Sequence, residues 1–217
     1  MEKPSATPAD DEVGRLGRDL TAGLLTPEGV WVAAYLGYRP ARDLLDAKAP
    51  AVFTLQSMRL GGDNHWRRAM RALGPRPPAF AACEIARMAA DIYFASPDSP
   101  PEVNALAREA VDIIASWKRA PRVELMTLLV KERCPPFFLA VDVGGAWSRE
   151  AGPRGRGLGT IVGHCYGVLL GWRSRSRRYV RSFGDMADRA CRFGVSEAEV
   201  TKVVAEEMIP FALGRAR

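Results

Sequence analysis

Trp31-Val-Ala-Ala-Tyr-Leu-Gly-Tyr-Arg-Pro-Ala-Arg-Asp-Leu-Leu45 is the stretch that decides the fold class of this chain. Its apolar residues recur at helical spacing, at Trp31, Ala34, Tyr35, Tyr38, Leu44 and Leu45. Gly37 and Pro40 interrupt the pattern once, and both residue types disfavour the interior of a helix. The stretch therefore predicts a packed corner between two helices, and it offers no residues for catalysis.

The residues before this corner predict one further helix. Residues 1–9 are expected to form a flexible lead-in, followed by a helix from Asp10 to about Leu25. One face of that helix would carry Val13, Leu16, Leu20 and Leu24. Thr26-Pro27-Glu28 then predicts a new helix start, with Thr as N-cap, Pro at the first helical position and an acid near the positive end of the helix dipole.

The residues after the corner repeat the helical spacing. Ser99 and Ser196, each followed three residues later by Glu, predict capping boxes. Almost no run alternates with period two, so the sequence predicts an all-α domain over residues 10–217, an orthogonal bundle or short helical-repeat-like array of about nine or ten helices. The helical segments are expected at 51–73, weakened by Gly61-Gly62, at 80–94, from the Ser99 cap to about Trp117, and at 121–133, 161–172, 179–193 and 197 onward. The Pro-rich run 74–78 is expected to end the first of them, and a loop is expected at 152–159.

One run is ambiguous. Phe137–Trp147 fits either a strand or a buried helix. A helix is favoured because no other run in the chain offers it a strand partner.

The composition is typical of a globular protein with a hydrophobic core. Of 217 residues 47% are apolar and 26% charged, which excludes wholesale disorder. The net charge of +6 mainly favours solubility. The N-terminal residues lack the apolar segment of a secretory signal, and the run Thr160–Trp172 is too short to cross a bilayer, so a cytoplasmic location and no membrane partner are expected.

The four cysteines are not arranged for metal or redox chemistry. No C-x-x-C pair occurs, and each cysteine lies in or beside an apolar helical run. They are expected to be small buried hydrophobes in a reducing compartment. The residues concerned are Cys83, Cys134, Cys165 and Cys191.

A cluster of arginines is the candidate binding site. Five arginines in nine residues could hold phosphates, and a tyrosine among them could stack on a base. The alternative is a solvated turn between helices whose arginines pair with Asp185 and Asp188. The candidate residues are Arg173, Arg175, Arg177, Arg178, Tyr179 and Arg181.

No coherent catalytic, metal-binding or cofactor-binding set is predicted. His164 and Cys165 are adjacent in a helix and do not face each other. His65, near Asp63, is a weak candidate for function. Leu139–Gly145 resembles the first phosphate loop of sugar kinases and related ATPases, but it lies in mid-chain without the Thr-rich hairpin that follows that loop, so a phosphate-handling enzyme is the least favoured function.

Three stretches resemble one family. They are Ala33-Ala-Tyr-Leu-Gly37 with Ala41-Arg42, the segment Pro101–Trp117, and Val195–Gly214. Together they are similar to an all-helical, poorly characterised family of GC-rich bacteria such as myxobacteria and planctomycetes, part of which is labelled as immunity proteins. The chain departs from that family at Tyr38, where the family often has His, and at Phe211, where it often has Trp.

The resemblance implies a packing pattern and a partner but no catalytic residues. Its motifs are Ala, Trp and Leu at helical spacing, which specify packing. The immunity label implies that the family binds toxins. We therefore expect a non-enzymatic cytoplasmic protein that binds another protein, with a toxin as the implied partner; the alternative is a nucleic-acid-associated protein that uses residues 173–181.

Overall fold

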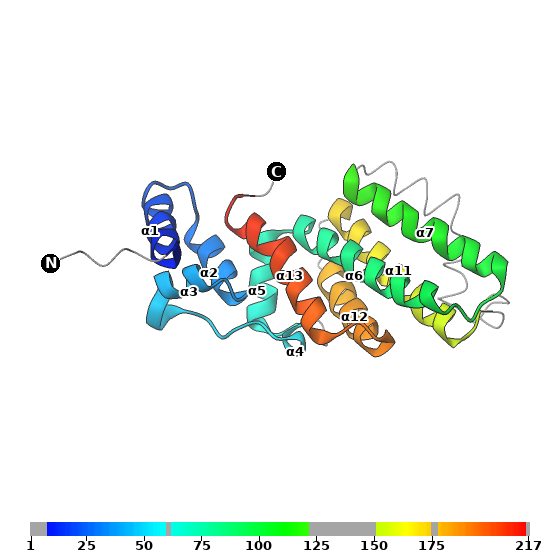
Figure 1. Ribbon diagram of the computed structural model, residues 1–217. Helices are drawn as coiled ribbons and strands as arrows, with labels where there is room; N and C mark the ends of the chain where they lie inside the picture. The colour runs from blue at the N-terminus through cyan, green and yellow to red at the C-terminus, as the bar shows by residue number, and fades with distance from the viewer. Residues whose placement is uncertain (1–7, 60–61, 122–150, 175–177, 216–217) are drawn as a thin grey trace.

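A computed structural model describes residues 8–59, 62–121, 151–174 and 178–215 (Figure 1). Within these residues the chain forms ten α-helices and one 3-10 turn and no strand, which confirms the all-α prediction. The helices are α1 (Pro8–Thr21), α2 (Pro27–Tyr35), α3 (Arg39–Leu45), α4 (Leu55–Met58), α5 (Asn64–Leu73), α6 (Arg76–Ala95), α7 (Pro101–Arg119), α11 (Pro153–Ser174), α12 (Arg178–Phe193) and α13 (Glu197–Ala212), and the 3-10 turn is η1 (Asp46–Lys48).

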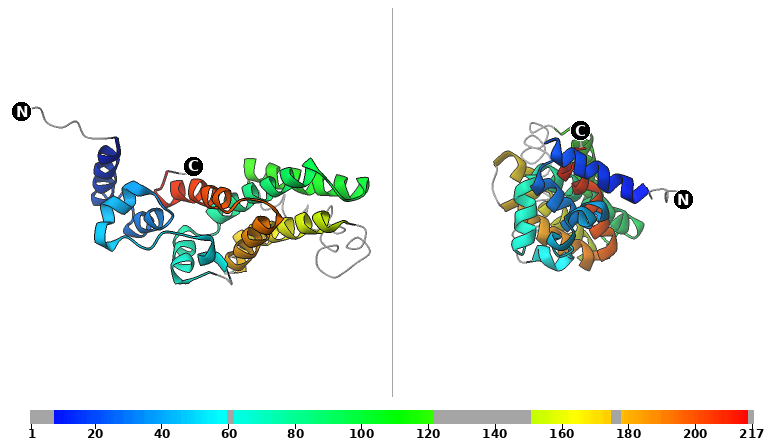
Figure 2. Two further views of the ribbon diagram at one scale, coloured as in Figure 1. Left: turned by 60° about the horizontal axis from the view of Figure 1, so that its bottom comes forward. Right: turned by 90° about the vertical axis from the view of Figure 1, so that its left-hand side faces the viewer.

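Helix α6 is the centre of an elongated bundle (Figures 1 and 2). It packs against α5, α7, α11, α12 and α13. Six of its alanines are almost completely buried, and such small side chains let neighbouring helices approach closely. Larger side chains fill the main core around it, among them Trp66, Tyr93, Tyr166 and Phe183.

A second, smaller core lies at the N-terminal end. It is built from residues of α1, α2 and α3, from Leu25 between α1 and α2, and from Leu213, which directly follows α13. Helix α2 serves both cores, because Val32 and Tyr35 belong to the main core while Val30 and Ala33 belong to the smaller one. This double burial explains why the sequence of α2 is apolar on every side.

The predicted corner between two helices is confirmed. Helix α2 ends at Tyr35 and α3 begins at Arg39, with Gly37 in the left-handed conformation at φ +95°. Thr26 caps α2 as predicted, since its Oγ1 accepts the N–H of Gly29 at 3.0 Å. The capping box at Ser196 also forms as predicted.

The predicted bounds of the first helix are wrong at both ends. Helix α1 begins at Pro8, inside the lead-in predicted for residues 1–9, and residues 1–7 lie outside the described part of the chain. It ends at Thr21, before a turn in which Gly23 has φ +71°. Leu24 therefore lies outside the helix, not on the predicted helical face, and its side chain is 73% exposed.

The segments on either side of Gly74 also differ from the prediction. The helix predicted over residues 51–73 is two helices, α4 and α5. The Pro-rich run 74–78 ends the preceding helix as predicted, because α5 ends at Leu73. The next helix, however, begins before the predicted Phe80, because α6 starts at Arg76 and takes Pro77 and Pro78 into its first turn. There the missing proline N–H groups cost nothing, since the first N–H groups of a helix have no partner within it.

The loop predicted over residues 152–159 is wrong as well, because α11 begins at Pro153. Two of its glycines are needed for close packing instead. A Cβ added at Gly155 would lie 2.1 Å from Ser99 Oγ, and one at Gly157 would lie 2.7 Å from the Phe193 ring. The glycines that suggested a loop therefore allow helices to approach.

The capping box predicted at Ser99 does not form. Pro100 is the N-cap of α7 and makes no side-chain capping bond. The Asn104 side chain instead donates a hydrogen bond to the Ser99 carbonyl at 2.8 Å. The preceding Asp98 caps α11, because its carboxylate accepts the N–H groups of Arg154 and Gly155 at 2.9 and 3.1 Å.

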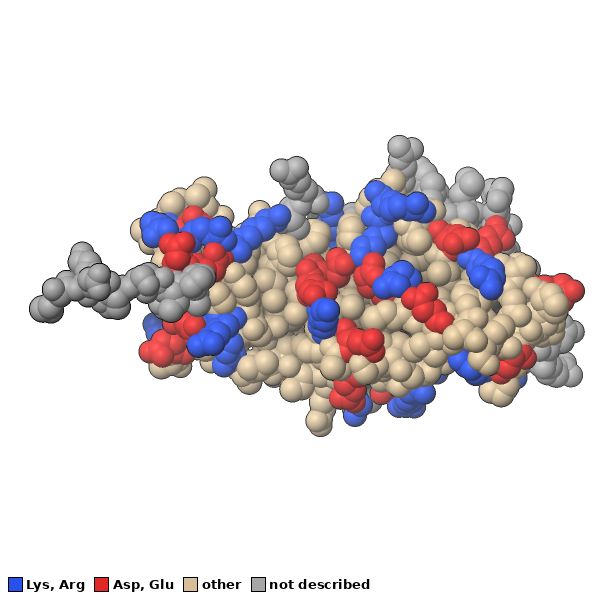
Figure 3. Space-filling view, viewed as in Figure 1, with Lys and Arg blue, Asp and Glu red and all other residues tan. Residues whose placement is uncertain are grey.

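Several expectations fall outside the described residues. The helix predicted over residues 121–133, beyond its first residue, and the ambiguous run 137–147 are among them, as are Cys134 and the phosphate-loop resemblance. No helix in the described ranges is long and apolar enough to cross a membrane. On the face shown in Figure 3, acidic and basic side chains are interspersed rather than gathered by sign.

Candidate functional site

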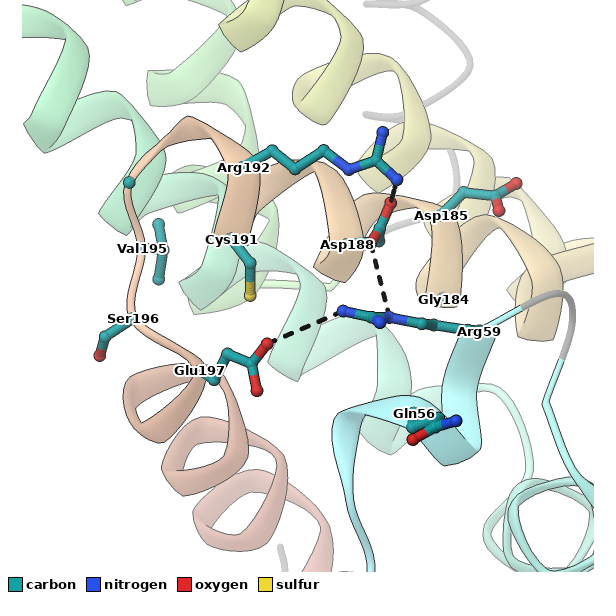
Figure 4. A pocket seen from close by; sticks show the side chains of 11 residues that line it. Gln56, Arg59, Gly184, Asp185, Asp188, Cys191, Arg192, Val195, Ser196 and Glu197 are labelled. Atoms are coloured by element: carbon teal, nitrogen blue, oxygen red, sulfur yellow. Dashed lines mark ion pairs between the residues drawn. The ribbon is translucent and has the colours of Figure 1, made fainter.

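A groove of about 1110 Å³ opens between α4, α12 and the turn that joins α12 to α13 (Figure 4). Charged side chains from separate parts of the sequence meet in it. The residues that line the groove are Gln56, Arg59, Gly184, Asp185, Asp188, Cys191, Arg192, Gly194, Val195, Ser196 and Glu197.

Two glycines shape the groove. A Cβ on Gly184 would lie 2.3 Å from the Met58 carbonyl oxygen, so only glycine lets α4 pack this closely on α12. Gly194 ends α12 at φ +121°, a conformation that other residues rarely adopt. The chain then turns directly into the capping box of Ser196, which places the start of α13 at the groove.

Arg59 crosses the groove between two carboxylates (Figure 4). Its Nε lies 3.6 Å from Asp188 Oδ1, and its Nη2 lies 3.7 Å from Glu197 Oε1. Both distances exceed that of a good hydrogen bond. The Arg59 and Glu197 side chains are 51% and 67% exposed, so water screens these ion pairs and each contributes little to stability.

Asp188 has a second and closer partner. Arg192 Nη2 lies 2.6 Å from Asp188 Oδ2, one helical turn away on α12. Asp188 thus stays paired if Arg59 moves, whereas no other ion pair of Glu197 is found in the described residues. Arg59 is therefore held by two long ion pairs, and Glu197 by one.

Cys191 faces the groove but is a poor nucleophile. Burial raises the pKa of its thiol, and the charges of Glu197 and Asp188 raise it further, against the opposing effect of Arg59. The thiolate is the reactive form, so the protonated thiol reacts slowly. In the described part of the chain no group of three or more His, Cys, Asp or Glu residues is placed to hold a metal ion.

Four of the six residues predicted as a binding cluster lie outside the described side chains: Arg173, Arg175, Arg177 and Arg178. Tyr179 is buried, and its hydroxyl donates a hydrogen bond to the Met70 carbonyl at 2.9 Å. Burial also raises the pKa of this hydroxyl. In this position the ring joins α12 to α5 and has no free face on which a base could stack.

Arg181 is the one predicted cluster arginine with a described side chain. It is 82% exposed, and its Nε lies 3.7 Å from Asp185 Oδ2. This ion pair agrees with the alternative prediction for the cluster, a solvated turn whose arginines pair with nearby acids. Asp188, the other acid expected to pair with the cluster, contacts Arg59 and Arg192.

The remaining candidate residues are in structural positions. His65 is exposed, and its ring lies 5.8 Å from that of Trp31. Asp63 caps α5 by accepting the Trp66 N–H at 2.7 Å. Cys83 and Cys165 are buried free thiols, as predicted, and burial is the main cause of the raised pKa of Cys165.

Sequence reasoning did not identify the groove. Asp188 is predicted only as a partner for the arginine cluster, and neither Arg59 nor Glu197 is predicted to form a binding site. One usable signal was Gly184, a glycine inside a predicted helix, which often marks a close approach. Comparison of the chain with protein-family models, with curated proteins and with solved structures gave no match.

Proposed function

We propose that this protein acts in the cytoplasm by binding another protein at the groove, without catalysing a reaction. The supporting observation is the Arg59 side chain, which spans the groove between Asp188 and Glu197 at 3.6 and 3.7 Å. Because these pairs are loose and solvated, charged groups of a partner can replace them at little energetic cost. Binding would then exchange weak internal pairs for pairs across an interface.

The make-up of the groove supports a protein partner. The half-buried Cys191 supplies apolar surface in the groove, next to the buried Val195, and charged side chains of both signs surround it. Protein interfaces combine an apolar centre with a polar rim in this way. Charges of both signs also fix the orientation of a partner more than they add to affinity.

Toxin neutralisation is the specific form of this proposal. It is supported by the three stretches that resemble a family partly labelled as immunity proteins. Nucleic-acid association through residues 173–181 remains the alternative function. A gel shift that weakens with salt, and that charge reversal of Arg175, Arg177 and Arg178 abolishes, would favour that alternative.

The test is affinity capture from cells of the source organism with three forms of the chain. The groove variant carries Asp185→Lys and Glu197→Lys. The control carries Glu102→Lys and Asp112→Lys on the exposed face of α7, which gives the same change in net charge. We expect one protein to bind the wild type and the control at a fixed ratio and to be lost from the groove variant. Circular dichroism checks that all three forms are folded.

Two results would contradict the proposal: no stoichiometric partner of the wild type, or the same partner on all three forms. The proposal of toxin neutralisation has a separate test. The captured protein, or the product of the neighbouring gene, is expressed alone and together with the chain. Growth arrest that the wild type relieves and the groove variant does not relieve would support neutralisation.

A further inference from the structure

The Glu12 carboxylate of α1 joins the two ends of the described chain. Tyr38 Oη and Arg215 Nη2 each donate a hydrogen bond to Glu12 Oε1 at 2.7 Å. Glu12 and Arg215 are 203 residues apart in sequence. Burial alone would raise the pKa of Glu12, but the hydrogen bonds from Tyr38, Arg215 and Arg15 outweigh it and lower that pKa to about 2.

The C-terminal end is itself firmly seated. Leu213 is buried in the smaller core. A Cβ on Gly29 of α2 would lie 2.2 Å from the Ala212 carbonyl oxygen, so the end of α13 rests directly on α2. The Arg215 N–H donates to the Pro210 carbonyl at 2.7 Å, which holds the Arg215 backbone in place beside α1.

Helix α1 has few other attachments. It packs mainly on α3, and Leu16 is its one fully buried side chain in the smaller core. Leu20 is only partly buried, and a Cβ on Gly17 would just touch Leu44 of α3 at 3.7 Å. The hydrogen bonds of Glu12 are therefore a large share of what holds α1 in place.

We propose that Leu213–Arg215 form a clasp that holds α1 on the body of the protein, so that α1 docks or detaches as a unit while the main core stays folded. Detachment would uncover part of the smaller core, including Leu44, which lies beside Gly17 of α1. This conformational device does not depend on the groove or on the proposed partner.

Hydrogen exchange on the full chain, read by mass spectrometry, tests the clasp. Arg215→Gln and Glu12→Gln each remove one charge of the ion pair that bridges α1 and the C-terminal end. Arg15→Gln is the matched control, because Arg15 pairs with the same carboxylate at 2.7 Å but belongs to α1 itself. We expect the first two variants to speed exchange in α1 roughly fivefold and the control to stay within about twofold.

Exchange in α6 and α11 must stay at the wild-type rate if only the clasp has opened. The Glu12→Gln/Arg215→Gln double variant should exchange in α1 no faster than Glu12→Gln alone, because the ion pair with Arg215 is already lost once the Glu12 charge is removed. The proposal of a clasp is overturned if Arg215→Gln leaves the exchange rate of α1 unchanged, if Arg15→Gln raises that rate equally, or if exchange rises equally throughout the protein.

Discussion

Lys118 of α7 and Glu207 of α13 are joined by a hydrogen bond from Nζ to Oε1 at 2.7 Å, across 89 residues of sequence. The same ammonium group donates to Glu84 of α6, so one cation connects three helices. Arg87 extends the network, donating to Glu84 at 2.9 Å and to Asp91 at 2.7 Å. These residues hold α7 and α13 to α6 from the outside of the core.

Replacing Lys118 with Met should destabilise the protein by about 1–2 kcal/mol, because two carboxylates lose a charged hydrogen bond while the apolar stem is kept. Lys118 is only 24% exposed, so solvent screens the interaction partly. Lys202→Met is the control, since Lys202 is 71% exposed and lies 3.8 Å from Glu206. Urea unfolding measures both, and equal losses would show that the network adds nothing.

The free energy of unfolding should fall at acidic pH. The folded-state pKa of Glu12 is lowered from 4.5 to about 2, and that of Glu84 is also lowered, because hydrogen bonds from Lys118 and Arg87 outweigh the effect of burial. A lowered pKa gives stability that is present above the unfolded value and lost as pH falls towards the folded value. The free energy of unfolding should therefore decline below about pH 4.5, and Glu12→Gln should make the decline shallower. Identical acid slopes would contradict this.

Gly29→Ala should destabilise the protein by about 2–3 kcal/mol. The new Cβ would meet the Ala212 carbonyl oxygen at 2.2 Å, and a backbone atom cannot move aside as a flexible side chain can. Gly14→Ala is the opposite case, because its Cβ would meet only the end of Arg18 at 3.5 Å. That change should stabilise the protein by about 0.5–1 kcal/mol through helix propensity. Thermal unfolding of both variants distinguishes the two signs.

Glu197→Gln should make Cys191 more reactive. The negative charge of Glu197 helps to raise the thiol pKa, so removing it lowers that pKa and increases the thiolate fraction. We expect alkylation by iodoacetamide at pH 8 to speed up on the order of twofold. Peptide mass spectrometry assigns the site, and the buried Cys83 serves as the unreactive reference. No change in rate would mean that Glu197 is too solvated to act on the thiol.

Local signals predicted the parts of the fold that local physics determines. The corner around Gly37 and the caps at Thr26 and Ser196 depend on residues within a few positions of one another, and all three are confirmed. The capping box at Ser99 failed although its pattern was the same. There the backbone enters the helix one residue later, at Pro100.

Tertiary packing determined the parts that could not be predicted. Gly155 and Gly157 indicated a loop because glycine weakens isolated helices, yet they lie in α11 where Ser99 and Phe193 come close. The groove was missed for the same reason. Arg59 and Glu197 are far apart in the chain, and no spacing rule relates them.

Helix α2 is shared between the two cores, and this limits how the chain can be shortened. A chain shortened to begin at Thr26 would lack α1 but keep α2. A chain shortened to begin after Tyr35 would lack Val32 and Tyr35 of the main core as well as Val30 and Ala33 of the smaller one. A fragment that lacks α2 would therefore expose the interior of the bundle to water, so the N-terminal part of the chain is not a removable appendage.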